Sequence, residues 1–150
     1  MSTNVTLEAL DVNNWLKICD LSVSEEQKHI FTVPNVYWIG ISRYEHKNEL
    51  FAIKLGDEFV GMIGGGFDED GESGLIEPVM VDYRFQGRGI AEQALKLMVK
   101  YLANHLSVNR VYIEHRRENH AMTHILNKID FEMLGEDEEG FRHFFDVRKI

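Results

Sequence analysis

Residues 79–94 read Val-Met-Val-Asp-Tyr-Arg-Phe-Gln-Gly-Arg-Gly-Ile-Ala-Glu-Gln-Ala. A short apolar run rich in β-branched residues ends at Asp82, and after a turn the apolar residues follow a spacing typical of a helix. The stretch therefore predicts a strand, a loop with two glycines and a helix. The rest of the chain is interpreted outward from this junction.

The loop from Gln86 to Ala91 is suited to binding an anion. Gly87 and Gly89 allow a tight turn and a close approach of the backbone to a ligand. The first amides of the following helix have no acceptor inside it, and the helix dipole is positive at that end. The sequence therefore predicts a phosphate or pyrophosphate site, with Arg88 as an additional cation. The alternative is an ordinary strand-to-helix connection.

Two well-known phosphate loops do not match. A Walker loop needs Gly-Lys-Ser/Thr, but Gly89 is followed by Ile90 and Ala91. A dinucleotide fingerprint needs a third glycine where this chain has Glu92. The segment resembles the acetyl-CoA loop of the GNAT family of N-acetyltransferases, whose pattern Gln/Arg-x-x-Gly-x-Gly/Ala is met by Gln86, Gly89 and Ala91.

Length and composition limit the function classes. The chain has 150 residues, 44% of them apolar, which is enough for one domain, residues 1–150, with its own core. Sixteen Lys and Arg against 25 Asp and Glu give a net charge of −9, which argues against nucleic acid as a partner and favours a cationic substrate. No apolar run approaches membrane-spanning length, and the single Cys19 fits a reducing cytoplasm.

The pattern of elements predicts an α/β fold, a mixed sheet of about seven strands flanked by four helices, and this order matches the acyltransferase fold of the GNAT family. We expect a helix that is capped by Asp11 and runs to Cys19. A capping box at Ser24 predicts a second, short helix. Gly64 to Gly66 are expected to form a flexible strand end or a bulge. Strands are expected at residues 5–10, 50–55, 59–64, 74–82, 108–114, 131–134 and 141–147, and further helices at 36–44, 90–106 and 121–129.

Pro78 lies inside the strand that leads to the glycine loop. Because proline cannot donate a hydrogen bond to a neighbouring strand, we expect a bulge or a local break there. Such a break exposes the backbone groups of Val79, Met80 and Val81. The resemblance implies that the pantetheine arm of acetyl-CoA pairs with them.

Glu77 is the candidate general base. An alkylammonium has a pKa near that of lysine, so keeping it neutral at pH 7 costs about 4 to 5 kcal/mol unless a base takes the proton. Glu77 lies next to the expected bulge and ten residues before Gly87. That offset is the one of the glutamate treated as the base in animal members of the family. The alternative is an exposed glutamate without a catalytic role.

Within the family, the chain is most similar to the spermidine and spermine acetyltransferases. The segment 23–27 resembles a helix start of the bacterial polyamine enzymes, and Asn119 matches the asparagine that helps to position CoA. The resemblance implies acetyl-CoA as co-substrate and a small polycationic amine as acceptor, with Glu25 and Glu26 at its distal end. Homodimers are common in the family. An aminoglycoside or peptide amine as acceptor, or a catalytically weak CoA-binding sensor, are the alternatives.

One position departs from the family pattern. The tyrosine near the CoA sulfur, taken as the general acid, is replaced by Leu126, which has no proton to donate. A water, Tyr112 or a histidine such as His115 then supplies the proton, or turnover is slow. Met122, where a smaller side chain is common, is expected to crowd the CoA channel.

No metal site is expected. His120 and His124 are four residues apart and would share a helix face, as metal ligands can. The sequence offers no evident third ligand beside them, so a pair on the helix surface is the preferred interpretation.

Overall fold

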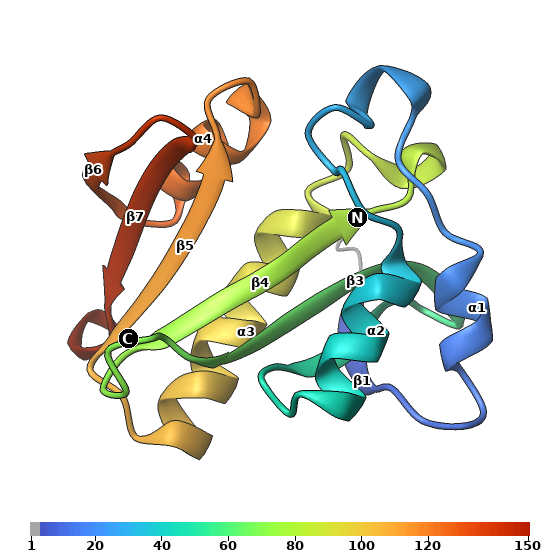
Figure 1. The fold of residues 1–150 in the computed structure, drawn as a ribbon, viewed down its shortest axis with the longest axis horizontal. Coiled ribbons are helices and arrows are strands. Elements are labelled where there is room, and N and C mark those ends of the chain that lie inside the picture. The colour runs from blue at the N-terminus through green and yellow to red at the C-terminus, as the bar shows by residue number, and fades with distance from the viewer. Residues whose placement is uncertain (1–3) are drawn as a thin grey trace.

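Seven strands form one sheet in the computed structural model, which describes residues 4–150 of the chain (Figure 1). The strands are β1 Val5–Ala9, β2 Glu49–Leu55, β3 Glu58–Phe67, β4 Gly74–Val81, β5 Arg110–Arg116, β6 Glu132–Glu136 and β7 Gly140–Asp146. Their spatial order is β1-β2-β3-β4-β5-β7-β6, and every neighbouring pair is antiparallel except β4 and β5, which are parallel.

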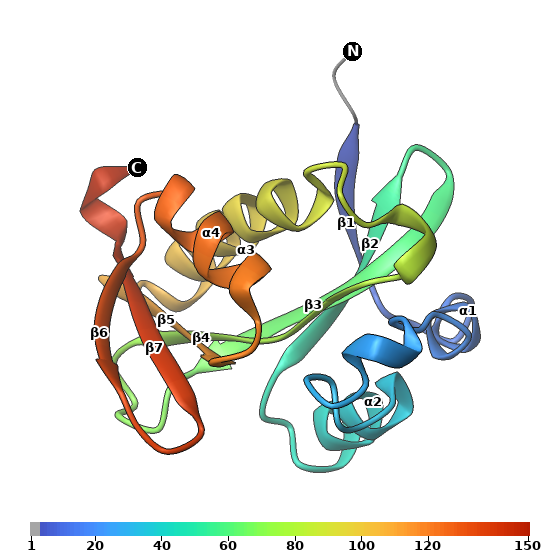
Figure 2. The same cartoon turned by 90° about the horizontal axis from the view of Figure 1, so that it is seen from above.

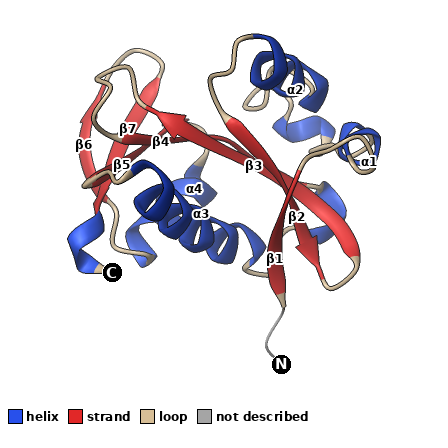
Figure 3. Cartoon of the chain, turned by 90° about the horizontal axis from the view of Figure 1, so that it is seen from below, coloured by secondary structure: helices blue, strands red, loops and turns tan. Residues whose placement is uncertain are grey.

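Helices cover both faces of this sheet (Figures 2 and 3). The α-helices are α1 Trp15–Cys19, α2 Asn35–Tyr44, α3 Ile90–Leu106 and α4 His120–Lys128, and the 3-10 turns are η1 Glu25–Gln27, η2 Tyr83–Phe85 and η3 Val147–Lys149. Helices α3 and α4 lie on one face, and α1 and α2 lie on the other. The predicted mixed sheet of about seven strands flanked by four helices is confirmed for residues 4–150.

Alternation along the strands supplies a separate core to each face. In β2, Phe51 and Ile53 face the larger core under α3 and α4, while Leu50 and Ala52 face the smaller core under α1 and α2. Burial of one such aliphatic side chain contributes about 1.5 to 3 kcal/mol. The two cores therefore hold both helix layers against the same central strands.

The first helical segments are shorter than expected. Helix α1 begins after Asn14, and the Asp11 carboxylate accepts from the backbone N of Asn13 and Asn14 at 2.8 and 3.1 Å, so Asp11 closes a turn in front of the helix instead of capping it. The capping box at Ser24 is confirmed. It opens only the 3-10 turn η1, and residues 28–34 then run without a helix to α2.

The bulge at Pro78 is confirmed. Ile63 pairs with Val79 and Gly65 pairs with Ile76, so the two residues Glu77 and Pro78 lie opposite Gly64 alone. The triple glycine belongs to β3, which continues to Phe67, and the register shift falls within it. A bulge at this place bends β4 away from its neighbours.

Strands β4 and β5 separate beyond the bulge. Their pairing is limited to Gly74–Ile76 against Val111–Ile113, although β4 continues to Val81 and β5 to Arg116 (Figure 1). The sheet therefore opens in its middle, between two parallel strands.

No helix within residues 4–150 combines the length and the apolar character needed to cross a bilayer.

Candidate active site

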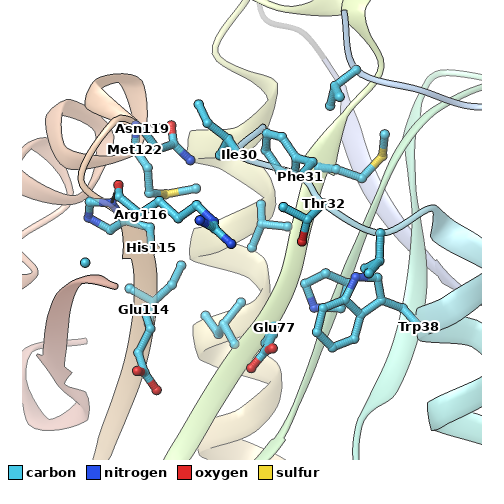
Figure 4. A pocket seen from close by; sticks show the side chains of 18 of the residues that line it. Ile30, Phe31, Thr32, Trp38, Glu77, Glu114, His115, Arg116, Asn119 and Met122 are labelled. Carbon is cyan, nitrogen blue, oxygen red and sulfur yellow. Dashed lines mark hydrogen bonds between the residues drawn. The ribbon is translucent and has the colours of Figure 1, made fainter. Parts of the chain in front are cut away.

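A cavity of about 950 Å³ lies where β4 and β5 separate (Figure 4). Residues 76–80 of β4 and 113–116 of β5 form its centre. One wall is formed by residues 19–23, 28 and 30–35, from the end of α1 to the start of α2, and the other wall by the start of α4 with the β6–β7 hairpin. The bulge and the end of the ladder thus create a site from segments far apart in the sequence.

Glu77 lies in this cavity, half-buried, and is one of the two residues of the bulge. Burial raises the pKa of its carboxyl, the nearby Glu114 raises it further, and Lys47 acts in the opposite direction. The Glu77 carbonyl accepts from Asn48 Nδ2 at 2.9 Å, which holds the backbone in place. A base with a raised pKa lies nearer the working pH, where proton transfer is most effective.

Glu114 faces the cavity from β5, one residue past the last pair with β4, as Glu77 does on its own strand. Its carboxylate is 2.7 Å from Arg142, which also binds Asp68 at 2.9 Å and covers the ring of Tyr112 at 4.1 Å. Sequence reasoning missed Glu114. The parallel register would have identified it, because equal offsets from paired residues place two side chains opposite one another.

The cavity has an excess of negative charge. Its acidic lining residues are Asp20, Glu77, Glu114, Glu136, Asp137 and Glu139. Its Lys and Arg residues are Lys28, Arg116 and Arg142. A cationic ligand is favoured in such surroundings, because a cavity with low-dielectric walls focuses the field of its charges.

The predicted acidic ligands lie outside this lining. Glu25 is exposed and pairs with Lys28 at 2.6 Å, and Glu26 follows it in η1. Lys28 does line the cavity. Glu25 and Glu26 therefore lie at the surface near the rim, and the carboxylates inside come from other segments.

The glycine loop follows β4 and η2 and leads into α3. Gly87 and Gly89 have φ of 79° and 77°, a left-handed conformation that glycine adopts without strain, and Gly89 is the residue before the helix. The Gln86 side chain donates to Gln27 Oε1 and to the Val81 carbonyl, each at 2.9 Å. The loop is thereby fastened to η1 and to the end of β4.

The residues predicted to hold acetyl-CoA fit that role. Among residues 4–150, no strand pairs with β4 on its β5 side beyond Ile76. Val79, Met80 and Val81 can therefore pair along that edge with an extended chain such as pantetheine. Past them, the amides from Gly87 to Ala91 lead into the positive end of α3, which suits a diphosphate. The Arg88 guanidinium lies over the Phe85 ring at 5.5 Å, on the same loop.

Asp82 was taken from the sequence only as the end of a strand, and the structure gives it a larger role. Its side chain is buried and accepts from Ser22 N at 3.0 Å, from Arg84 N at 3.1 Å and from Arg84 Nε at 2.8 Å. Burial raises the pKa of Asp82, but the hydrogen bonds from Arg84 and Ser22 outweigh burial and leave that pKa lowered. Asp82 joins the cavity wall at Ser22 to the start of the glycine loop.

Asn119 caps α4 at the upper edge of the cavity (Figure 4). Its Oδ1 accepts from Met122 N at 3.2 Å, and both residues line the cavity. Leu126, one turn further along, is fully buried and does not line it. The helix thus brings no proton donor to the cavity at the position where the family has its tyrosine.

The other residues considered as proton donors differ in their placement. Tyr112 is buried and does not line the cavity, whereas His115 does. Burial lowers the pKa of His115, and its Nδ1 lies 2.9 Å from the Arg116 carbonyl, a contact that assigns the single proton of the neutral ring to Nδ1. The ring stacks on the buried His143 at 5.1 Å. His115 therefore faces the cavity as a neutral imidazole whose only N–H is already used.

Comparisons with known proteins agree with this architecture. A family model described as the acetyltransferase (GNAT) family matches residues 10–131. The chain is 24% identical over 139 residues to a spermine/spermidine N(1)-acetyltransferase of Bacillus subtilis (strain 168), and this alignment covers 89% of the chain and 91% of the relative.

Solved structures are similar in fold. A spermidine N-acetyltransferase from Vibrio cholerae, in complex with CoA and spermine, superposes with a TM-score of 0.77 at 15% identity, over 97% of this chain and 96% of that one. A dodecameric spermidine N-acetyltransferase from the same organism gives a TM-score of 0.71 at 16% identity, over 97% and 95% of the two chains. At these identities the likeness concerns the fold alone.

Proposed function

Because the chain belongs to the acetyltransferase (GNAT) family, we propose that it transfers acetyl from acetyl-CoA to a primary amine of a small polycation of the spermidine or spermine class. It is an N-acetyltransferase, and acetyl-CoA is its acyl donor. The observation that carries the choice of acceptor is the cavity between β4 and β5, where acidic residues outnumber Lys and Arg and a half-buried Glu77 lies at the centre.

The chain's own residues hold the donor at two places. The edge of β4 at Val79, Met80 and Val81 aligns the pantetheine arm, and the amides from Gln86 to Ala91 with Arg88 bind the diphosphate. Asn119 fixes the start of α4 beside the cavity. Acetyl-CoA supplies an activated acetyl thioester when it is bound.

Glu77 accepts the proton of the incoming ammonium, directly or through one water. Its raised pKa brings it closer to that of the amine, which lowers the free-energy cost of the transfer. Asn48 and the bulge hold the strand backbone that carries this carboxylate. The neutral amine then attacks the thioester carbonyl.

The distal ammonium groups of a polyamine need further carboxylates. Asp20, Glu136 and Glu139 line the cavity and extend its negative charge away from Glu77. Glu25 and Glu26 are proposed to act further out, after Lys28 releases Glu25 to the ligand. A chain of amines spaced by methylenes can contact such separated carboxylates, whereas a monoamine cannot.

A thiol-release assay with acetyl-CoA tests this choice of acceptor. The panel contains spermidine, spermine, an aminoglycoside and a lysine peptide, and kcat/KM is measured for each one. We expect the two polyamines to give the highest values. A higher value for the aminoglycoside or for the peptide would replace the polyamine assignment.

Glu77→Gln tests the proposed base. We expect kcat to fall about 100-fold, because an amide cannot accept the proton, while the affinity for acetyl-CoA measured by calorimetry stays within about twofold. Glu58→Gln, which removes one carboxylate outside the cavity lining, is the matched control and should leave kcat unchanged. An unchanged kcat in Glu77→Gln would remove Glu77 from the role of base.

A catalytically weak CoA-binding sensor is the second candidate function. The observation that favours it is Leu126, buried where the family has a tyrosine. Tight acetyl-CoA binding without thiol release on any amine of the panel would support the sensor. Thiol release with any of these amines at an ordinary enzymatic rate would exclude it.

Self-association stays a prediction. The family expectation is a homodimer, and one structural neighbour is described as dodecameric. Sedimentation velocity of the purified protein, with and without spermine, distinguishes a monomer, a dimer and a larger assembly.

A further inference from the structure

Arg116 is a cation inside the acidic cavity that has no ion-pair partner among residues 4–150. It lines the cavity, and neither a carboxylate within 4.0 Å nor a hydrogen bond from its guanidinium occurs in that part of the chain. Lys28 and Arg142, the other two cations of the lining, are each paired with a carboxylate. Arg116 is exposed, so its charge is free to meet a ligand that enters the cavity.

Arg116 lies on the part of β5 that has separated from β4. Ile113 is the last residue of β5 that pairs with β4, opposite Ile76, and Arg116 is as far beyond Ile113 as Val79 is beyond Ile76. Figure 4 shows the guanidinium extending from β5 into the space between the two strands, on the same side of the cavity as Asn119 and Met122. Arg116 thus lies across the opening from the β4 edge proposed to align pantetheine.

The tyrosine that the family uses to protonate the departing sulfur is replaced by Leu126 in this chain. Leu126 has no proton to give, Tyr112 lies outside the cavity lining, and the only N–H of neutral His115 is bonded to a carbonyl. A thiolate next to an arginine is stabilised without any proton transfer, because the cation lowers the pKa of the thiol. Arginine keeps its charge throughout the working pH range and can fill this role at any pH of interest.

We propose that Arg116 stabilises the CoA thiolate as it departs, in place of a general acid. This inference rests on the proposed acetyl transfer. Glu77 takes the first proton of the ammonium, the neutral amine nitrogen forms the new C–N bond, and the electron pair of the C–S bond goes to sulfur. The second N–H proton of the acylated nitrogen is released to water. Arg116 remains protonated and compensates the negative charge on sulfur, which takes a proton from water after it has left.

The ionisation of bound CoA tests this directly, without turnover. The ultraviolet absorbance of the thiolate is followed with pH for CoA bound to the wild type, Arg116→Gln, Arg116→Lys and Arg110→Gln, with desulfo-CoA as the blank. We expect the pKa of the bound thiol to be higher by about 1 in Arg116→Gln, and to be largely restored by lysine. Arg110→Gln is the matched control, because Arg110 lies on the same strand outside the cavity lining.

Each outcome of this titration has one meaning. An equal thiol pKa in the wild type and Arg116→Gln, with CoA bound to both, overturns the role of Arg116 and leaves the acetyltransferase proposal in place. Absence of CoA binding to the wild type overturns both. A thiol pKa that is higher in Arg116→Gln than in the wild type, and unchanged in Arg110→Gln, supports the inference.

Steady-state kinetics separate this role from acceptor binding. Arg116→Gln should lower kcat about tenfold, and this factor should be the same for every amine. The KM for the amine should stay unchanged. A change confined to KM, or one that differs from amine to amine, would assign Arg116 to acceptor binding and overturn the inference.

Discussion

The two halves of the β4–β5 pair differ although the same two strands form both. In the lower half, Gly74–Ile76 pairs with Val111–Ile113, and both isoleucines are buried. In the upper half, which we call the open half, the two strands do not pair within residues 4–150 (Figure 1). Charged side chains follow the last paired residue on each strand. The comparison shows that the centre of the site comes from the loss of pairing between two core strands.

The bulge between the halves depends on a glycine in the neighbouring strand. Gly64 of β3 faces both Glu77 and Pro78. A Cβ added at Gly64 would lie 2.5 Å from Leu50 Cδ2 and 2.8 Å from the Glu77 carbonyl oxygen. Both distances are shorter than van der Waals contact, so the bulge of β4 needs a residue without a side chain at this point.

Gly64→Ala should disturb the boundary between the halves most. We expect a loss of about 1 to 3 kcal/mol in the free energy of unfolding, measured by urea denaturation, because the new methyl group overpacks the core. Gly40→Ala in α2 is the control: its Cβ would meet nothing within 4 Å, and alanine favours a helix by about 1 kcal/mol. Equal stability of the two variants would mean that the bulge tolerates a side chain.

Gly89→Ala tests the far end of the open half. At a φ of 77° an alanine is strained by about 1 to 2 kcal/mol, so we expect the loop to shift and the affinity for acetyl-CoA, measured by calorimetry, to fall about tenfold. Gly40→Ala is again the control, because Gly40 lies outside the cavity lining and has neither a positive φ nor a neighbour within 4 Å of an added Cβ. Unchanged affinity in Gly89→Ala would show that the diphosphate is held elsewhere.

Much of the open half could be predicted from the sequence because its signals are local. Pro78 predicts a bulge from its missing N–H, and two glycines before an apolar helical pattern predict the loop and α3. Glu77 follows from its neighbours in the chain. Each of these inferences needs no more than about ten consecutive residues.

The roles that could not be predicted from the sequence depend on hydrogen-bond and ion-pair partners that are distant in the sequence. Asp82 is fixed by Ser22, 60 residues earlier, and Glu114 by Arg142, 28 residues later, so neither role can be seen in a window of the chain. The start of α1 was misplaced for a local reason. Asp11 and Asn14 are both residue types that favour a cap, and the helix begins after Asn14, whose side chain makes no cap hydrogen bond and instead donates from Nδ2 to Glu8 and to the Ala9 carbonyl at 3.0 Å.

Glu114→Gln has the smallest expected effect and tests one specific charge in the open half. Glu77 must be ionised to accept a proton, so the rate falls as the pH drops through its pKa. Burial first and Glu114 second raise that pKa, so the acid limb of kcat/KM lies above the ordinary value of a glutamate. Removing the Glu114 charge should move this limb to lower pH, by less than about 1.

Lys47→Gln is the matched variant with the opposite sign, because Lys47 lowers the pKa of Glu77. Its removal should move the acid limb to higher pH, so the two variants bracket the wild type in a single set of pH profiles. A limb that stays in place in both variants would mean that neither charge reaches the base. The carboxylates of β4 and β5 would then act on the substrate separately, and the opening between the strands would be only a passage for the ligands.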